Sequence, residues 1–132
     1  TAISASTLEP EPTWNHISVV ADSLEKKKLY HDAAIGTRYQ ITSLTKGLEL
    51  LKTVERDPPD IIVLDVMLPD IDGWRVLMRL HENTQTRPIP VIVCSVVRER
   101  DLALSLGAAQ VLTKPFRPHA FIQALDQAYP QV

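Results

Sequence analysis

Short apolar runs alternate with amphipathic stretches along most of this chain. Five runs rich in β-branched and aliphatic residues predict strands at 16–22, 38–44, 61–65, 90–95 and 110–114. The stretches that follow them predict helices at 23–34, where the apolar stripe is weak, and at 45–56, 73–83, 98–108 and 117–129. The runs at 61–65 and 90–95 are apolar almost throughout, as is typical of central parallel strands covered on both faces.

This alternation predicts an α/β fold in which right-handed crossovers build a parallel sheet with helices on both faces. A closed barrel of eight such units needs roughly 200 residues or more. The chain has 132 residues, so an open, doubly wound sheet of five strands is the better fit. Residues 1–15 are small, polar and proline-containing, which predicts a linker or flexible N-terminal segment before one domain over 16–132. Such a segment could tether an upstream domain.

Composition narrows the classes of function. The net charge of -2 and the pI near 6.0 give no basic excess that would favour nucleic acid or an anionic membrane. No apolar run approaches the ~18 residues of a membrane span, and there is no signal-peptide pattern. The single cysteine, Cys94, cannot form an internal disulfide, so we expect a reducing, cytoplasmic location. Its place inside a strand predicts an inert, buried thiol.

Polar side chains end four of the five predicted strands. Asp22 ends the first, Asp65 the third, Ser95 the fourth and Lys114 the fifth. Ligands of open α/β sheets bind outside the carboxyl ends of the strands, so we expect these side chains to converge. Two nearby carboxylates repel unless a cation lies between them, and Mg²⁺ suits such a site. An aspartate beside Mg²⁺ and a lysine can attack a phosphoryl group and form an aspartyl phosphate.

The chain lacks the sequence motifs of other proteins that bind or hydrolyse phosphates. The chain contains neither G-x-x-x-x-G-K-[ST] nor G-x-G-x-x-G. A small Mg²⁺-dependent phosphatase of the haloacid-dehalogenase type would need a second aspartate two residues after Asp65, as general acid. That position is Met67, which argues against a phosphatase.

The segments "IIVLDVMLPDIDGW", "PVIVCS" and "LTKPF" together resemble the receiver domain of response regulators in two-component signalling. The resemblance runs from about residue 17 to residue 129 and implies the flavodoxin-like strand order 2-1-3-4-5. It also implies a partner, either a sensor histidine kinase or a histidine phosphotransfer protein. Catalysis would be limited to the domain's own phosphotransfer and dephosphorylation.

The resemblance also implies a role for each strand-end residue. Asp65 would be the phosphoacceptor, and Mg²⁺ would be held by Asp22, Asp65 and the backbone carbonyl of Met67. Ser95 would be the hydroxyl that closes on the phosphoryl group. Lys114 would pair with the phosphoryl oxygens, and its bond to the following proline would be cis.

Three departures from the family pattern leave an alternative open. Ala21 stands where a second acid is usual, Val111 replaces an aromatic residue on the fifth strand, and the segment 95–114 is shorter than expected. Losing a carboxylate should weaken Mg²⁺ binding. The alternative hypothesis is therefore a degenerate receiver that acts as a phosphorylation-independent protein–protein interaction module.

We expect the remaining charged residues to have structural roles and not to take part in the chemistry of the site. We predict that Asp60 marks the solvent end of its strand and that Asp70 and Asp72 serve as turn and cap residues. The run Lys26-Lys27-Lys28 is interpreted as a solvated helix face. The four histidines show no metal-ligand spacing.

Overall fold

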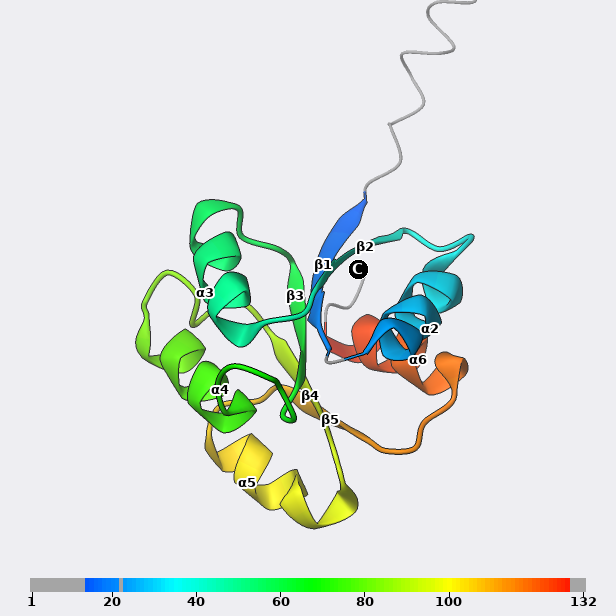
Figure 1. Cartoon of the computed structure of the whole chain (residues 1–132). Coiled ribbons are helices and arrows are strands. Elements are labelled where there is room, and N and C mark those ends of the chain that lie inside the picture. Colours follow the sequence, from blue (N-terminus) through cyan, green and yellow to red (C-terminus); the bar gives the residue numbers. More distant parts are fainter. Residues whose placement is uncertain (1–13, 22, 129–132) are drawn as a thin grey trace, which may run out of the picture.

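The chain folds around one five-stranded parallel sheet (Figure 1). The computed structural model describes residues 14–21 and 23–128. The strand order is β2-β1-β3-β4-β5, which confirms the predicted flavodoxin-like topology. The strands are β1 (Asn15–Val20), β2 (Tyr39–Leu44), β3 (Ile61–Asp65), β4 (Val91–Ser95) and β5 (Gln110–Thr113).

Five α-helices cover the two faces of the sheet. They are α2 (Leu24–Ala34), α3 (Gly47–Arg56), α4 (Gly73–Glu82), α5 (Arg100–Ser105) and α6 (Pro118–Ala128). Helices α2 and α6 lie together on one face, and α3, α4 and α5 lie on the other (Figure 1). Helix α5 has only six residues after a short 3-10 turn, η1 (Val97–Glu99), in agreement with the short segment noted in the sequence.

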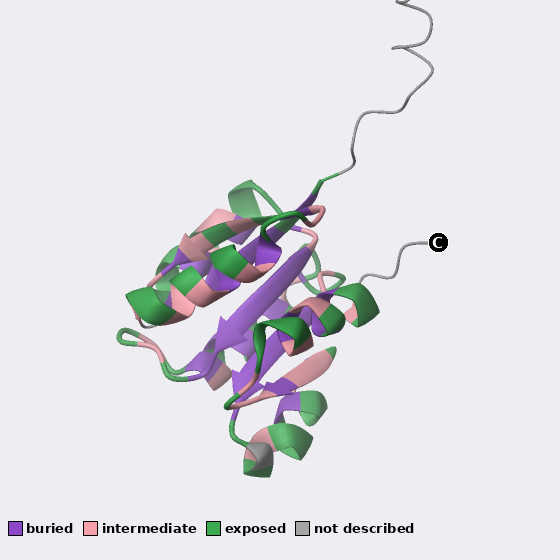
Figure 2. Cartoon of the chain, turned by 90° about the vertical axis from the view of Figure 1, so that its right-hand side faces the viewer, coloured by how far each residue is buried: buried purple, intermediate pink, exposed green. Residues whose placement is uncertain are grey.

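Alternation along the central strands divides the core into two layers (Figure 2). Ile61 and Val63 face α2 and α6, where they join Tyr30 and Phe121. The neighbouring residues of β3 face the opposite way, into the layer beneath α3 and α4. All five residues of β3 and of β4 are buried, as the continuous apolar runs predicted.

Short polar side chains fix the helix starts that border the carboxyl ends of the strands. Ser23 caps α2 by accepting the Lys26 backbone N–H at 3.2 Å, and Asp72 caps α4 by accepting the Trp74 N–H at 3.0 Å. Asp70 caps a different helix, because its two oxygens accept the first backbone N–H groups of α3 at 2.9 and 3.1 Å. The predicted turn and cap roles of Asp70 and Asp72 are therefore confirmed.

The described part of the chain begins just before the first strand. Asn15 is the first residue of β1 and is buried, while residues 1–13 of the predicted linker lie outside the described residues. The domain boundary thus stays a prediction.

Asp60, at the opposite end of the sheet from Asp65, exchanges hydrogen bonds with the backbone of His16, which confirms its structural role. No described helix is long and apolar enough to cross a membrane.

Candidate phosphoacceptor site

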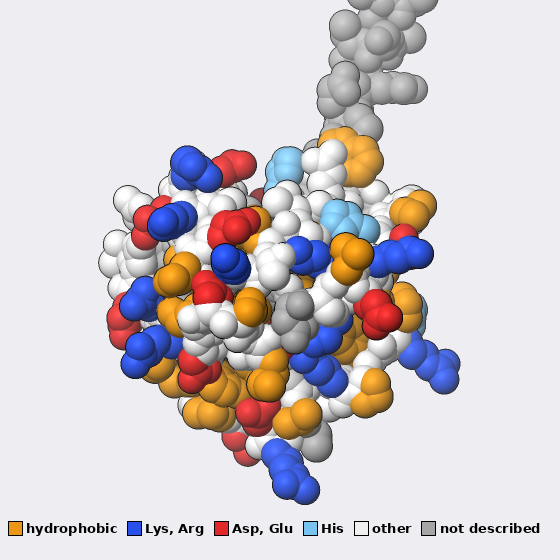
Figure 3. All heavy atoms as spheres, in the orientation of Figure 1, with side chains coloured by type: hydrophobic (Ala, Val, Ile, Leu, Met, Phe, Trp, Pro, Cys, Tyr) orange, Lys and Arg blue, Asp and Glu red, His pale blue; other side chains and the backbone are white. Residues whose placement is uncertain are grey.

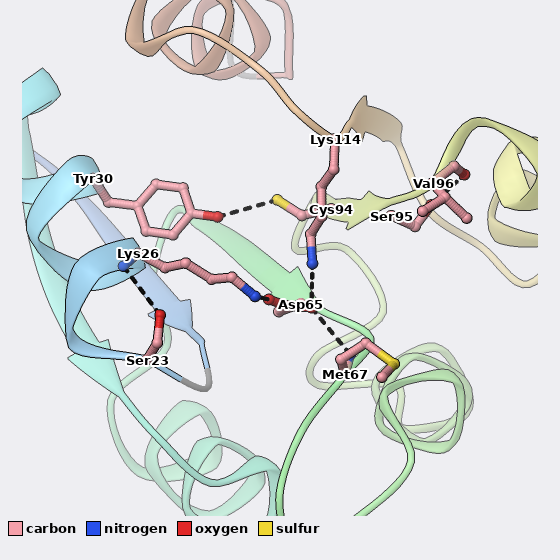
Figure 4. A network of polar contacts seen from close by, with 9 residues as sticks. All are labelled: Ser23, Lys26, Tyr30, Asp65, Met67, Cys94, Ser95, Val96 and Lys114. Carbon is pink, nitrogen blue, oxygen red and sulfur yellow. Dashed lines mark hydrogen bonds and ion pairs between the residues drawn. The ribbon is translucent and has the colours of Figure 1, made fainter.

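Three of the predicted site residues lie at the carboxyl ends of neighbouring strands (Figure 4). Asp65 is the last residue of β3, Ser95 is the last residue of β4, and Lys114 directly follows β5. The parallel registers place Asp65 beside Cys94 and Ser95 beside Thr113, so the topology alone brings the three chain segments together. Asp22, the fourth predicted residue, lies outside the described residues.

The Asp65 carboxylate is buried and is held by three donors. Its side chain is 0% exposed. Oδ1 accepts from the Lys114 ammonium at 2.8 Å and from the Met67 backbone N–H at 3.0 Å. Oδ2 accepts from the Lys26 ammonium at 2.9 Å. Each carboxylate oxygen therefore has its own lysine, and such charge-assisted bonds offset the loss of hydration on burial.

The donors also determine in which direction the pKa of the Asp65 carboxyl is shifted. Burial by itself would raise the pKa of the Asp65 carboxyl, because a charge is costly to remove from water. The hydrogen bonds from Lys114, the Met67 backbone and Lys26 together outweigh burial and lower this pKa below its ordinary value of 3.8. Asp65 is therefore a carboxylate at neutral pH, which is the form in which an aspartate can act as a nucleophile.

This lowered pKa predicts a loss of stability in acid. Asp65 contributes stability that is fully present above the ordinary pKa of 3.8 and is lost as the pH falls through the lower pKa of the folded state. Urea unfolding in metal-free buffer from pH 7 to pH 2.5 should show a steeper fall for the wild type than for Asp65→Asn. Equal pH dependence of the two proteins would contradict this account.

Ser95 is buried but turned away from the carboxylate. Its hydroxyl donates to the carbonyl oxygen of Val96 at 3.2 Å, and Figure 4 shows Ser95 beside Val96 and away from Asp65. Val96 itself is about half exposed, at 51%. The hydroxyl is thus at the predicted strand end, but among the described residues its hydrogen bond goes to Val96 and not to Asp65 or Lys114.

Lys114 is fixed by its backbone as well as by its charge. Its N–H donates to the Ser95 carbonyl at 2.9 Å, which extends the pairing of β4 and β5 by one bond. The Lys114-Pro115 bond is cis, as the resemblance implied. The lysine side chain is 24% exposed, so it reaches a buried carboxylate from the edge of solvent.

The described residues supply only part of a metal site. They include no group of three or more acidic, histidine or cysteine side chains that could hold an ion. Ala21 is fully buried and offers only a methyl group beside the end of β1. Within the described part of the chain, the Asp65 carboxylate and the Met67 carbonyl are the predicted oxygen ligands, a donor type that suits Mg²⁺.

Lys26 is the site residue that the sequence interpretation missed. The prediction of a solvated lysine face is wrong for Lys26, because its ammonium contacts Asp65. It holds for Lys28, which is exposed. The signal was its position in the first turn of α2, four residues before the buried Tyr30, so that both lie on the same helix face.

Cys94 has no role in this chemistry. Its buried sulfur lies 3.4 Å from the Tyr30 hydroxyl, and burial raises the pKa of the thiol to about 12. The predicted inert thiol is confirmed, because the thiolate form is negligible at neutral pH.

Comparison with known proteins shows the family of this chain. Residues 17–126 match the family model for the response regulator receiver domain. The chain is 35% identical over 102 residues to response regulator PleD of Caulobacter vibrioides, covering 75% of this chain and 22% of that protein. It is 40% identical over 81 residues to the alkaline phosphatase synthesis transcriptional regulatory protein PhoP of Bacillus subtilis, covering 61% and 34%. The chain thus spans about a fifth to a third of these two relatives.

Solved structures share the fold. Chemotaxis response regulator CheY4 of Vibrio cholerae superimposes with a TM-score of 0.82 at 20% identity, over 88% of this chain and 99% of that one. The receiver domain of sensor histidine kinase PA1611 from Pseudomonas aeruginosa, which has a magnesium ion in its active site cleft, gives 0.79 at 22% identity, over 87% and 97%. With the family match over most of its length, this chain belongs to the response regulator receiver domains of two-component signalling.

Proposed function

We propose that this domain is a phosphorylation switch that accepts a phosphoryl group on Asp65. The observation that carries the proposal is a fully buried carboxylate at the end of a central strand with the Lys114 ammonium 2.8 Å from one oxygen. Lys114 directly follows β5, two strands away from β3 in the sheet, so the fold brings a cation from a distant segment onto this carboxylate. The donor would be a sensor histidine kinase or a histidine phosphotransfer protein.

The transfer uses groups that are already in place. A carboxylate oxygen of Asp65 attacks the phosphorus, the bond from phosphorus to the donor's imidazole nitrogen breaks, and the imidazole leaves with the electron pair. An acyl phosphate remains on Asp65. Lys114 stabilises the charge on the transferring oxygens, because its ammonium already lies against the nucleophile and needs little reorganisation.

The site also suits Mg²⁺ as the cofactor. Asp22, Asp65 and the Met67 carbonyl would hold it, since all three supply oxygen ligands. When bound, Mg²⁺ would offset the negative charge that gathers between the carboxylate and the phosphoryl group. The lowered pKa of Asp65 keeps the carboxyl deprotonated and ready for a metal across the neutral range.

The structural readout would begin at Ser95. In the structure its hydroxyl donates to the Val96 carbonyl, and a phosphoryl group on Asp65 would offer it a stronger, charged acceptor. Turning Ser95 would release the start of η1 and α5, where Val96, Leu102 and Leu104 are exposed. Figure 3 shows hydrophobic side chains gathered over the lower part of this face, where Figure 1 places α4 and α5. That surface would change its partner affinity on phosphorylation.

A groove beside Asp65 gives the phosphodonor a place to dock. It has a volume of about 500 Å³ and runs between α2 and the segment after β5. Its walls are Lys26, Leu29, Tyr30, Val96, Lys114, Pro115 and Phe116. An amphipathic helix that carries the phosphohistidine would fit this mostly apolar groove, with the two lysines next to the incoming phosphoryl group.

Intact-mass measurement tests the proposal. Incubation with acetyl phosphate and MgCl₂ should add one phosphoryl group, and neutral hydroxylamine should remove it, because hydroxylamine cleaves acyl phosphates and leaves phosphoserine intact. Absence of any adduct, or an adduct that resists hydroxylamine, would overturn phosphorylation of Asp65.

A further inference from the structure

Two ammonium groups divide the Asp65 carboxylate between them. Lys114 takes Oδ1, which also accepts the Met67 N–H, and Lys26 takes Oδ2 at 2.9 Å. Oδ2 is therefore the oxygen with fewer donors, where a further cation would meet least crowding. In Figure 4 the Lys26 side chain extends along the site from α2 and ends at this oxygen.

The fold holds Lys26 in this position. The residue lies in the first turn of α2, whose start is fixed by the Ser23 cap. One turn later Tyr30 is buried, which fixes the helix face that points at the site. The Lys26 side chain is 37% exposed, so its stem lies partly against protein while its ammonium reaches a buried partner.

The end of β1 supports the same inference. Ala21 is fully buried there and brings no oxygen ligand to the site. A carboxylate at that position would add negative charge and favour a divalent ion. Without a carboxylate at position 21, less negative charge opposes the Lys26 ammonium at the oxygen that a metal would need.

We propose that Lys26 is a built-in counterion of Asp65 that competes with Mg²⁺ for Oδ2. This inference rests on the proposed function and concerns the regulation of the same site. Mg²⁺ binds oxygen ligands at about 2.1 Å, so an ion on Oδ2 would lie within a few ångström of an ammonium on the same atom. Like charges at that separation repel, so metal binding requires the Lys26 ammonium to move away.

The competition has a direct consequence for the metal affinity. The free energy of the Lys26–Asp65 ion pair is lost whenever Mg²⁺ binds, and the affinity falls by the corresponding factor. Removing the charge of Lys26 should therefore tighten Mg²⁺ binding, which is the opposite of what removing a merely structural residue would do.

The test is an Mg²⁺ titration without phosphodonor. MgCl₂ is added at constant ionic strength, and the backbone amide signal of Met67, which contacts Asp65, is followed by ¹H–¹⁵N NMR. Lys26→Met, which keeps an apolar stem, should lower the Kd for Mg²⁺ roughly five- to tenfold, the scale of one partly buried ion pair.

Two further variants control the result. Lys28→Met removes the same charge from an exposed position on the same helix and should change the Kd by less than about twofold. Lys26→Arg keeps the charge and should retain nearly the wild-type affinity. Circular dichroism melting verifies that each variant is folded before titration.

The outcomes separate this inference from the proposed function. Equal or weaker Mg²⁺ binding by Lys26→Met, or no binding by any variant at tens of millimolar, overturns the competition, even if acetyl phosphate labels Asp65. Tighter binding by Lys26→Met supports the competition, even if no protein acquires a phosphoryl group. In that case only the proposed function fails.

Discussion

Replacing Asp65 with asparagine is expected to abolish the phosphoadduct formed with acetyl phosphate and MgCl₂. An amide carries no negative charge and is a far poorer nucleophile than a carboxylate. It also leaves the ammonium groups of Lys26 and Lys114 facing a neutral side chain, so both of their ion pairs with residue 65 are lost. Intact-mass measurement after a fixed incubation should detect the adduct on the wild type and none on Asp65→Asn.

Asp72→Asn is the matched control for this experiment. Asp72 lies in the same loop, is exposed, and caps α4 through a side-chain oxygen that asparagine also provides. This variant should acquire the adduct to the wild-type extent. An adduct on Asp65→Asn would mean that another group, such as the Ser95 hydroxyl, accepts the phosphoryl group, and the proposed function would be wrong.

Among substitutions of a glycine by alanine in this domain, Gly73→Ala is expected to cause the largest loss of stability. A Cβ there would lie 2.3 Å from the Val66 Cα and 2.7 Å from its carbonyl oxygen. Both are backbone atoms, and they cannot give way without moving the segment that follows Asp65. The Gly73 N–H also donates to the Val66 carbonyl at 3.1 Å, so the clash breaks a hydrogen bond. We expect a loss of about 3 kcal/mol in the free energy of unfolding.

Gly36→Ala separates steric overlap from backbone conformation. Gly36 has a φ of +79° but no atom within 4 Å of an added Cβ, so only the left-handed conformation is penalised there. That penalty is about 1 kcal/mol. Urea unfolding of the two variants should rank Gly73→Ala well below Gly36→Ala. The reverse order would show that the loop after Asp65 relaxes freely and does not constrain the site.

The sheet and three of the site residues could be predicted because they depend on local patterns. The apolar run of β3 ends at Asp65, and a parallel topology then places it near Ser95 and Lys114 without further information. The ends of β4 and β5 lay within one residue of their predicted places for the same reason. A change from apolar to polar residues is a strong marker of where a buried strand ends.

What could not be predicted depends on contacts between distant segments. Asp70 was predicted to cap, yet the helix it caps begins 23 residues earlier in the chain, at Gly47. The contact of Lys26 with Asp65 spans 39 residues, and a run of three lysines gives no hint of which one turns inward. The rotation of α2 about its axis decides that, and it is set by packing of the helix against the sheet.

The position of β5 at the border of the sheet has a mechanical consequence. Among the described strands, β5 pairs with β4 alone, so a shift of β5 would break a single ladder of hydrogen bonds. The Lys114 N–H donates to the Ser95 carbonyl at the top of that ladder. Lys114, which contacts the Asp65 carboxylate, and Ser95 are thus joined by a hydrogen bond at one of the two edges of the sheet. Under the proposed function, a change of charge at Asp65 would reach this edge of the sheet without rearranging the central strands.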